Sequence, residues 1–471
     1  MKRVNVADLR ARAPRTFKIA DMQSQHSDGL PLPQRHWAML AIGLAIMMAV
    51  LDGAIANVAL PTIARDLKAS PADAVWVVNA YQLVITILIL PLASLGEIVG
   101  YRRIYRVGLV VFTVSSLACA LSDSLVVLTL ARVVQGVGAA GVMSVNSALV
   151  RFIYPRRQLG RGIGINALVV AVSAAIGPTV AAGILSVATW PWLFAINLPI
   201  GVATLFAARA LPRTPHAARS FDTLSALLNA LFFGLLIVAI DSVGHGELAL
   251  YSVLAFAGAG LAGVALVVRQ LPRTSPLLPV DLLCIPLFAL SIATSVCSFT
   301  AQMLAYIAMP FYFQDALGRG AVATGLLITP WPVATAVMAP IAGRLADRYS
   351  AGILGALGLI VFAAGLALLA ILPPAPSDAD IVWRMALCGA GFGLFQSPNN
   401  RAIISSAPHE RSGGASGMLG TARLLGQTSG AALMALMFGL AGARATLWAL
   451  GTAAAIALLA AVVSSTRMFD K

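Results

Sequence analysis

Fourteen stretches of mostly apolar residues divide this chain of 471 residues. A helix needs about 20 such residues to cross the hydrocarbon layer of a membrane. Only 11% of the residues are charged, whereas a soluble domain carries about 25%, so an ordinary soluble protein is excluded. No alternating ten-residue pattern of strands is visible. We therefore expect an all-α integral membrane protein with fourteen transmembrane helices, at 37–60, 76–96, 105–122, 125–150, 162–187, 192–211, 223–243, 248–268, 284–313, 321–343, 352–372, 381–400, 414–440 and 445–466.

The basic residues favour one orientation of these helices. If the N-terminus is cytoplasmic, 25 of the 32 Lys and Arg residues fall in cytoplasmic segments, four fall outside and three lie within helices. Cytoplasmic loops of membrane proteins carry such an excess. This distribution explains the net charge of +14 without a nucleic-acid partner. The polar segment 1–36 lacks the short apolar core and cleavage site of a signal peptide, so we expect a cytoplasmic tail.

A weak internal repeat divides the helices into two similar sets. Ala59-Leu60-Pro61 recurs as Ala308-Met309-Pro310, and Gly177 recurs as Gly430, each about 250 residues later. One six-helix set is shorter than the distance of about 250 residues between the repeated motifs. The residues left over hold two further helices. Parallel repeats of this kind occur in transporters. We expect a 6+2+6 arrangement with a six-helix bundle at 37–211, a two-helix insertion at 212–283, a second bundle at 284–466 and a cytoplasmic tail at 467–471.

Carboxylates and arginines gather at corresponding loops of the two sets. Such clusters can join two helices by charge-assisted hydrogen bonds, and breaking them would open the cytoplasmic side. The alternative is a solvated turn that merely follows the charge rule for cytoplasmic loops. Because the cluster occurs in both sets, we favour a cytoplasmic gate, made of Glu97, Gly100, Arg102 and Arg103 in the first set and of Gly343, Asp347 and Arg348 in the second.

These loops resemble the signature loop of the major facilitator superfamily, Gly-x-Leu-Ala-Asp-Arg-x-Gly-Arg-Arg. The second copy matches its first half, whereas the first copy has Glu97 where Asp is usual. The run from Leu128 through Arg132 to Ala140 matches the fourth-helix motif, and Leu51-Asp52 through Pro61 is similar to the fourteen-helix drug:proton antiporters. The resemblance covers 37–466. It implies the major facilitator fold, a bacterial cytoplasmic membrane with both termini cytoplasmic, and export of amphipathic molecules in exchange for protons.

Asp52 and Arg132 are the two charges most suited to proton coupling. A charged side chain within a transmembrane helix costs at least ~2.5–3.5 kcal/mol and usually faces a cavity or a partner. The position that the repeat equates with Asp52 is Ala301, so the fold itself does not require an acid there. We expect Asp52 to bind a proton or a cationic substrate, and by resemblance Arg132 to take part in coupling. The alternatives are an acid paired permanently with a basic neighbour and an arginine that bonds backbone carbonyls.

Gly177, Pro178 and Gly183 resemble the antiporter motif of the fifth helix. Pro178 removes a backbone donor and bends or loosens a helix, as an ordinary membrane proline also does. The resemblance implies that this helix prevents leakage. Arg384 and Arg423 are weaker candidates, each as readily structural as functional.

Several uncharged side chains are candidates for a central substrate site, although contacts between helices or core packing explain each as well. Amide and aromatic groups within helices can bind an amphipathic or cationic ligand. The candidates, besides Asp52, are Asn57, Tyr81, Gln82, Asn146, Gln302, Tyr306, Gln396 and Asn399.

No motif for a cofactor, a metal or catalysis is found. The chain lacks the GxxxxGK[ST] loop of ATPases, and its four cysteines form no CxxC pair. We expect no enzyme and no catalytic residue, but a monomeric, proton-coupled exporter of amphipathic, cationic small molecules that works by alternating access in the lipid bilayer. Two alternatives stay open: an exporter of an endogenous metabolite, such as a siderophore or self-made antibiotic, and a lipid-translocating or sensing protein without proton coupling.

Overall fold

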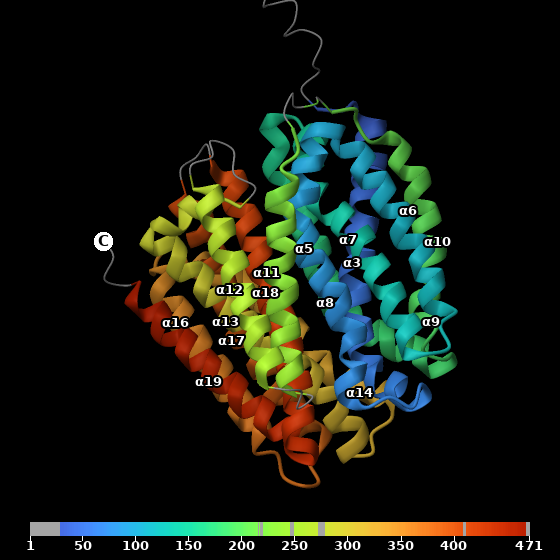
Figure 1. Ribbon diagram of the computed structural model, residues 1–471, viewed down its shortest axis with the longest axis vertical. Coiled ribbons are helices and arrows are strands. Elements are labelled where there is room, and N and C mark those ends of the chain that lie inside the picture. Colours follow the sequence, from blue (N-terminus) through green and yellow to red (C-terminus); the bar gives the residue numbers. More distant parts are fainter. Residues whose placement is uncertain are drawn as a thin grey trace, which may run out of the picture.

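The computed structural model describes residues 29–214, 216, 220–244, 249–271, 278–407 and 411–467. Helices account for most of this part of the chain, and it contains no strand. The helices run roughly along the long axis of the molecule (Figure 1). Of the expected tails, 1–36 and 467–471, residues 1–28 and 468–471 lie outside the described residues, and the first described helix already begins at Leu32.

The first set of helices contains the longest helix of the protein. In chain order the set is α3 (Leu32–Asp66), α4 (Pro71–Ala74), α5 (Trp76–Val99), α6 (Tyr101–Ala120), α7 (Leu125–Ile153), α8 (Leu159–Val187), α9 (Trp192–Ala195) and α10 (Asn197–Ala207), with 3-10 turns at Arg156–Gln158 and Ala208–Ala210. Ser124 begins α7 by accepting a hydrogen bond from the Val127 amide.

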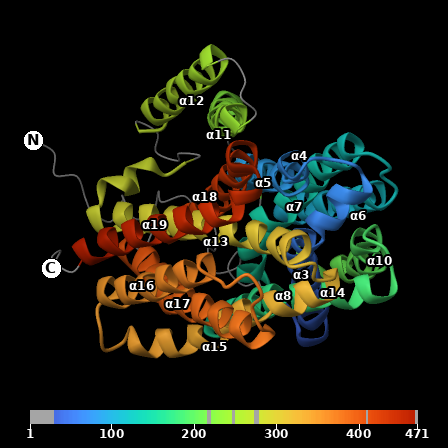
Figure 2. The same ribbon diagram turned by 90° about the horizontal axis from the view of Figure 1, so that it is seen from below.

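Two helices separate this set from the last one. They are α11 (Thr223–Gly244) and α12 (Ala249–Gln270), and they pack against each other. Figure 2 shows the pair at the edge of the molecule, where α11 contacts α5 and α18. The helices of both other sets thus remain adjacent to each other.

The last set repeats the pattern of the first. It contains a 3-10 turn at Val280–Cys284, α13 (Pro286–Phe311), a π-helical turn at Tyr312–Ala316, α14 (Ala321–Ile328), α15 (Pro330–Leu345), α16 (Ala351–Ala370), α17 (Asp378–Ser406), α18 (Ser412–Ala441), a 3-10 turn at Gly442–Arg444 and α19 (Ala445–Thr466). One expected helix, 321–343, is divided because Pro330 has no amide hydrogen and so begins a new segment.

Thirteen helices among the described residues are long and apolar enough to cross a membrane. The fourteenth expected segment, 381–400, lies inside α17, which is 29 residues long. Arg384, Gln396 and several glycines lower the hydropathy of α17, although its length suffices for a crossing. The prediction of an all-helical membrane protein is confirmed.

Glycines allow the same close helix contact in each set. A Cβ on Gly138 of α7 would lie 2.3 Å from the Phe112 amide nitrogen of α6. A Cβ on Gly391 of α17 would lie 2.4 Å from the Phe362 amide nitrogen of α16. These pairs occupy matching positions of the repeat. Small residues let membrane helices approach closely, and both sets use this contact to fix neighbouring helices.

Candidate functional site

A cavity of about 640 Å³ lies between the two six-helix sets. Its walls come from α3, α5, α7 and α8 on one side, and from α13, α14, α15, α17 and α18 on the other. Apolar and amide side chains form most of the wall. A site shared by two repeats is the arrangement that alternating access requires, because rocking one repeat against the other opens it to each side in turn.

Six of the expected substrate contacts lie on the wall of this cavity. They are Asn57, Tyr81, Gln82, Gln302, Tyr306 and Gln396. The Oδ1 atom of Asn57 and the Oε1 atom of Gln82 are buried and have no hydrogen-bond partner in the described part of the chain. Both residues line the cavity, so a rotation of either side chain would turn its unpaired oxygen toward a ligand.

Three other expected contacts are not on that wall. Asn146 donates to Asn166 Oδ1 at 2.8 Å, and Asn166 itself lines the cavity. Asn399 donates to Ser295 Oγ at 2.8 Å and accepts from Arg467 at 2.6 Å. Asn399 therefore connects α17 with α13 and the end of α19. Asp52, the third, lies behind the cavity wall.

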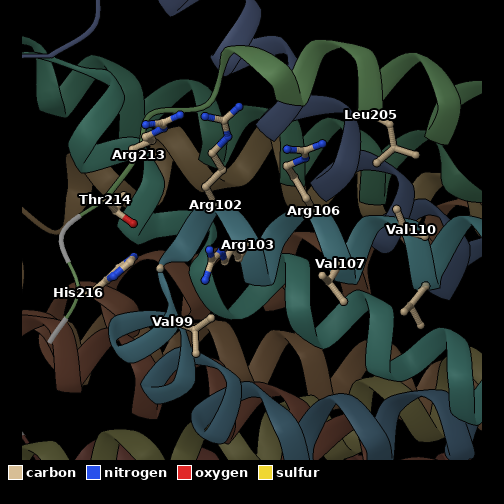
Figure 3. A pocket seen from close by; sticks show the side chains of 12 residues that line it. Val99, Arg102, Arg103, Arg106, Val107, Val110, Leu205, Arg213, Thr214 and His216 are labelled. Carbon is tan, nitrogen blue, oxygen red and sulfur yellow. The ribbon is translucent and has the colours of Figure 1, made fainter. Parts of the chain in front are cut away.

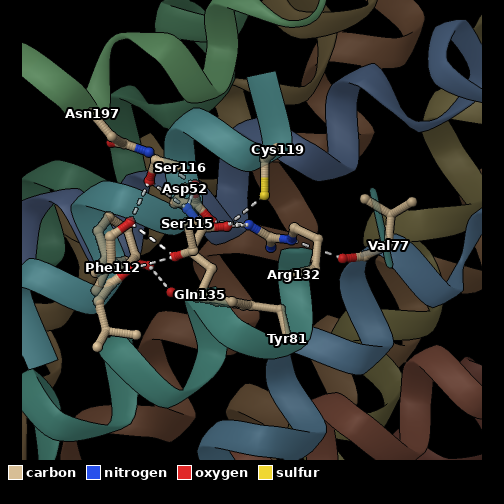
Figure 4. Close-up of polar contacts among 12 residues, drawn as sticks. Asp52, Val77, Tyr81, Phe112, Ser115, Ser116, Cys119, Arg132, Gln135 and Asn197 are labelled. Atoms are coloured by element: carbon tan, nitrogen blue, oxygen red, sulfur yellow. Dashed lines mark hydrogen bonds and ion pairs between the residues drawn. The ribbon is translucent and has the colours of Figure 1, made fainter. Parts of the chain in front are cut away.

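Asp52 is buried in a network that joins five helices (Figure 4). Its Oδ2 atom accepts a hydrogen bond from Arg132 Nη1, and this contact is also an ion pair. Its Oδ1 atom accepts from Gln135 Nε2 at 2.9 Å and from Asn197 Nδ2 at 3.0 Å. Gln135 Nε2 also donates to Ser116 Oγ at 2.9 Å. Both carboxylate oxygens are thus occupied, and the side chain is 1% exposed.

Hydrogen bonds from two nitrogens and two aromatic rings hold Arg132, while its Nη2 atom is buried without a hydrogen-bond partner among the described residues. Its Nε donates to the Val77 carbonyl at 2.9 Å, and its Nη1 donates to Gln135 Oε1 at 2.6 Å. The guanidinium carbon lies 4.0 Å from the ring centre of Tyr81 and 5.5 Å from that of Phe194. Rings at such distances stabilise a cation. Sequence reasoning selected Asp52 and Arg132 separately, and the structure brings them together.

Tyr81 separates this network from the cavity. The ring covers the Arg132 guanidinium, and the same side chain lines the cavity. Its hydroxyl donates to the Ala49 carbonyl at 3.2 Å, which holds the ring against α3. A change at Asp52 can therefore reach a bound molecule through one aromatic side chain.

The first gate loop contacts the segment that follows α10. Gly100 has φ +102°, a conformation that L side chains rarely adopt, and an added Cβ would lie 2.9 Å from His216 Nε2. The Tyr101 amide donates to Thr214 Oγ1 at 3.0 Å, and Arg102 donates to the Arg209 carbonyl at 2.9 Å.

A pocket of about 950 Å³ lies beside the same loop (Figure 3). Its polar part is basic, and its remaining wall is largely apolar. The basic residues that line it are Arg102, Arg103, Arg106, Arg213 and His216.

The second gate loop forms an ion pair with a neighbouring helix. Asp347 forms an ion pair with Arg401 of α17, not with its sequence neighbour Arg348. Both side chains are more than half exposed. Gly343 lies on α15 near Ser397 of α17. The Asp347–Arg401 pair joins α15 to α17 within one helix set.

The fifth-helix motif lies at two close helix contacts. A Cβ on Gly177 would lie 2.6 Å from the Ala54 Cβ on α3. A Cβ on Gly325 of α14 would likewise lie 2.6 Å from the Pro178 carbonyl oxygen. Gly183 faces open space. Gly177 and Pro178 therefore allow α8 to pack against both helix sets near the cavity.

The two sets also touch at the end that the charge pattern places outside. Arg65 and Thr62 of α3 donate to Gln314 Oε1 at 2.9 and 3.1 Å, and Gln314 Nε2 donates to the Val58 carbonyl at 3.0 Å. Arg65 and Asp315 lie 3.7 Å apart. These contacts close the outer end between α3 and the π-helical turn after α13.

Comparisons with known proteins agree with this architecture. The Major Facilitator Superfamily model matches residues 42–431 and again 290–468. The uncharacterized transporter YebQ of Escherichia coli (strain K12) is 60% identical over 452 residues, which cover 95% of this chain and 98% of that protein. The multidrug resistance protein Stp of Mycobacterium tuberculosis (strain CDC 1551 / Oshkosh) is 33% identical over 404 residues, which cover 84% of this chain and 74% of Stp.

Solved structures share the fold. The crystal structure of a D-xylose-proton symporter superposes with a TM-score of 0.67 at 14% identity, and the match covers 91% of this chain and 97% of that one. The expectations of the major facilitator fold, and of a multi-pass transporter and not an enzyme, are confirmed. The chain belongs to the Major Facilitator Superfamily.

Proposed function

We propose that this protein is a proton-coupled antiporter that exports amphipathic small organic molecules by alternating access. The observation that carries the proposal is the buried Asp52–Arg132 pair directly behind the wall of a cavity shared by both helix sets. The printed name of Stp, a multidrug resistance protein, supports the export of drug-like molecules.

Protonation of Asp52 is the coupling event. An uncharged Asp52 no longer neutralises Arg132, so the guanidinium loses its counter-charge while it is still covered by Tyr81. Leaving a buried charge without its partner is strongly unfavourable. The network therefore rearranges, and Tyr81 transmits the change to the cavity. A membrane potential supplies about 2.3 kcal/mol per elementary charge per 100 mV toward this cycle.

We propose that the described conformation is the one open toward the cytoplasm. The outer end is closed by Arg65, Thr62 and Gln314, whereas the cavity extends along α8 and α17 to Asn166 and Asn400. Both residues lie toward the helix ends that the charge pattern places inside. We further propose a monomer in the bacterial cytoplasmic membrane, with cytoplasmic termini, bundles at 37–211 and 284–466 and the insertion at 212–283. The loops around Glu97 and Asp347 form its cytoplasmic gate.

Proton movement in proteoliposomes tests the coupling. Asp52→Asn keeps the shape of the side chain but removes the carboxylate. We use probes that carry no titrating proton, sulforhodamine B and rhodamine 6G, and record external pH with an electrode. The wild type moves protons when one of the probes is added, and Asp52→Asn moves none.

Asp380→Asn is the matched control, because Asp380 also pairs with an arginine, Arg384, but does not line the cavity. It retains proton movement. Probe-driven proton movement by Asp52→Asn at the wild-type rate contradicts the proposal.

The two alternatives predict other outcomes. An exporter of an endogenous metabolite couples to protons but leaves the dye resistance of the cell unchanged when it is deleted. A lipid-translocating or sensing protein moves no protons with any probe.

A further inference from the structure

The wall of the central cavity carries a single formal charge, and it is positive. Of the described residues that line it, Arg423 on α18 is charged, and none is Asp or Glu. Leu419, Arg423, Leu424 and Gln427 line the cavity from the same face of α18. The guanidinium thus belongs to the wall and not to an outer surface of the helix.

Arg423 has no partner. Its Nε atom is buried without a hydrogen-bond acceptor, and the described residues offer the side chain neither an ion pair nor any other hydrogen bond. A charge inside a membrane protein normally has a partner or faces a pathway. A molecule that enters the cavity can supply the counter-charge that Arg423 lacks.

Three other arginines with buried or partly buried side chains have partners. Arg132 has Asp52, and Arg384 has Asp380. Arg467, just past α19, donates to Asn399 Oδ1 and Ser291 Oγ. Arg423 differs from these three arginines, because it lies on the cavity wall and has no partner among the described residues.

The rest of the wall suits a flat organic body. Phe299, Tyr306 and Phe392 line the cavity together with Tyr81. The amide side chains of Asn57 and Gln82 add polar groups to this wall. A guanidinium presents its donors in a planar fork that matches carboxylate, sulfonate and phosphate groups.

We propose that the cavity binds aromatic organic anions, whose acidic group pairs with Arg423. This deepens the proposed function and rests on it, since it concerns the same cavity. It replaces the expectation of a cationic substrate, because the one candidate carboxylate, Asp52, has both oxygens occupied and lies behind Tyr81. A cation in the cavity would meet Arg423 and no described carboxylate.

Binding of charge-matched probes to the purified, full-length protein tests the assignment. One pair is sulforhodamine B and rhodamine 6G, and the other is 2-naphthalenesulfonate and trimethyl-2-naphthylammonium. Within each pair the aromatic body is similar and the net charge is opposite, since sulforhodamine B adds two sulfonates to the cationic ring system that rhodamine 6G also has. We expect at least one anion to bind about tenfold more tightly than its cationic counterpart, a difference of about 1.4 kcal/mol.

Variants of Arg423 assign the preference to this side chain. Arg423→Gln weakens anion binding about tenfold and leaves cation binding unchanged or stronger, whereas Arg423→Lys retains part of the preference. Arg384→Gln, which removes an arginine outside the cavity wall, retains the wild-type preference. Size-exclusion profiles show whether each variant is folded, and Arg423→Lys remains informative if Arg423→Gln does not fold.

The proposal is overturned if the wild type binds no anion, if it prefers the cation of each pair, or if folded Arg423→Gln keeps the preference for anions. Binding needs no proton gradient, so the two proposals fail separately. Anion binding that depends on Arg423 without proton movement contradicts only the coupling. Proton movement driven by cations alone contradicts only the substrate class.

Discussion

Asp52 and Arg132 form one buried ion pair, and we expect the loss of either partner to lower stability. Removing one partner of a buried ion pair leaves the other charge uncompensated and costs about 3–5 kcal/mol. We expect Arg132→Gln to lower the free energy of unfolding by this amount. The double variant Asp52→Asn with Arg132→Gln leaves no uncompensated charge, so it recovers at least about 1 kcal/mol of the loss.

Thermal unfolding of the purified protein in detergent measures this double-mutant cycle. Asp380→Asn with Arg384→Gln serves as the control cycle, because that pair is more exposed. Its coupling energy is smaller, about 1 kcal/mol or less. Equal coupling energies in the two cycles would mean that Asp52 and Arg132 do not act as a buried pair.

Single residues were predicted from the sequence to different degrees. A charge inside an apolar helix is visible in the sequence, so Asp52 and Arg132 could be selected. Their pairing depends on how α3 and α7 are rotated toward each other, which hydropathy does not encode. Asn197 and Gln135 complete the network by the same tertiary packing. The sequence equally could not show that Arg423 has no partner, because that requires the positions of all its neighbours.

At the scale of the helix, close packing depends on glycine at matching positions of the repeat. A methyl group on Gly138 or Gly391 would lie far inside normal contact distance of a backbone nitrogen, which cannot rotate away. We expect Gly138→Ala and Gly391→Ala to separate their helix pairs and to lower the free energy of unfolding by about 1–3 kcal/mol each.

The control for this prediction is Gly183→Ala, since Gly183 meets nothing within 4 Å. It changes stability by less than about 0.5 kcal/mol. Thermal unfolding of the three variants in detergent, side by side, measures the difference. If all three behave alike, the glycines act through helix propensity and not through close contact.

Helix positions were predicted well and helix interruptions poorly. Long apolar runs fix where a chain crosses the membrane, so each expected segment coincides with a helix or a pair of helical pieces. The breaks at Ile196 and Thr329 were not predicted, because they depend on local packing and, at Pro330, on a missing amide hydrogen. In α17 the polar residues lower the mean hydropathy, so hydropathy alone does not mark this helix as a membrane span, although it is long enough to cross a membrane.

At the scale of the whole molecule, the repeat predicted which helices correspond but not how the two sets meet. Charge asymmetry predicted an orientation, and the repeat offset indicated a two-helix insertion. The contacts between the sets arise from side chains far apart in the chain, such as Arg65 and Gln314, and no sequence pattern links them. The placement of α11 beside α5 and α18, shown in Figure 2, likewise follows from packing alone.

The outer closure gives the last prediction, because alternating access requires this end to open. Thr62 Oγ1 and Gln314 Oε1 are 3.1 Å apart across the two sets. In a variant that lacks the native cysteines, Thr62→Cys with Gln314→Cys can be joined by a short bifunctional thiosulfonate reagent. We expect transport in proteoliposomes to fall about tenfold or more on cross-linking, because the outer end can no longer open, and to recover after reduction.

Ser242→Cys with Ser252→Cys is the matched control, since these hydroxyls are 2.8 Å apart but join α11 to α12 only. Both control residues are buried near the ends of their helices, as the test pair is near the ends of α3 and α13. Cross-linking the control pair leaves transport unchanged, because α11 and α12 need not separate for the two six-helix sets to rock. Full transport by the cross-linked Thr62–Gln314 pair would show that substrates cross without separation of α3 from the turn after α13, and the rocking of two helix sets would no longer describe this transporter.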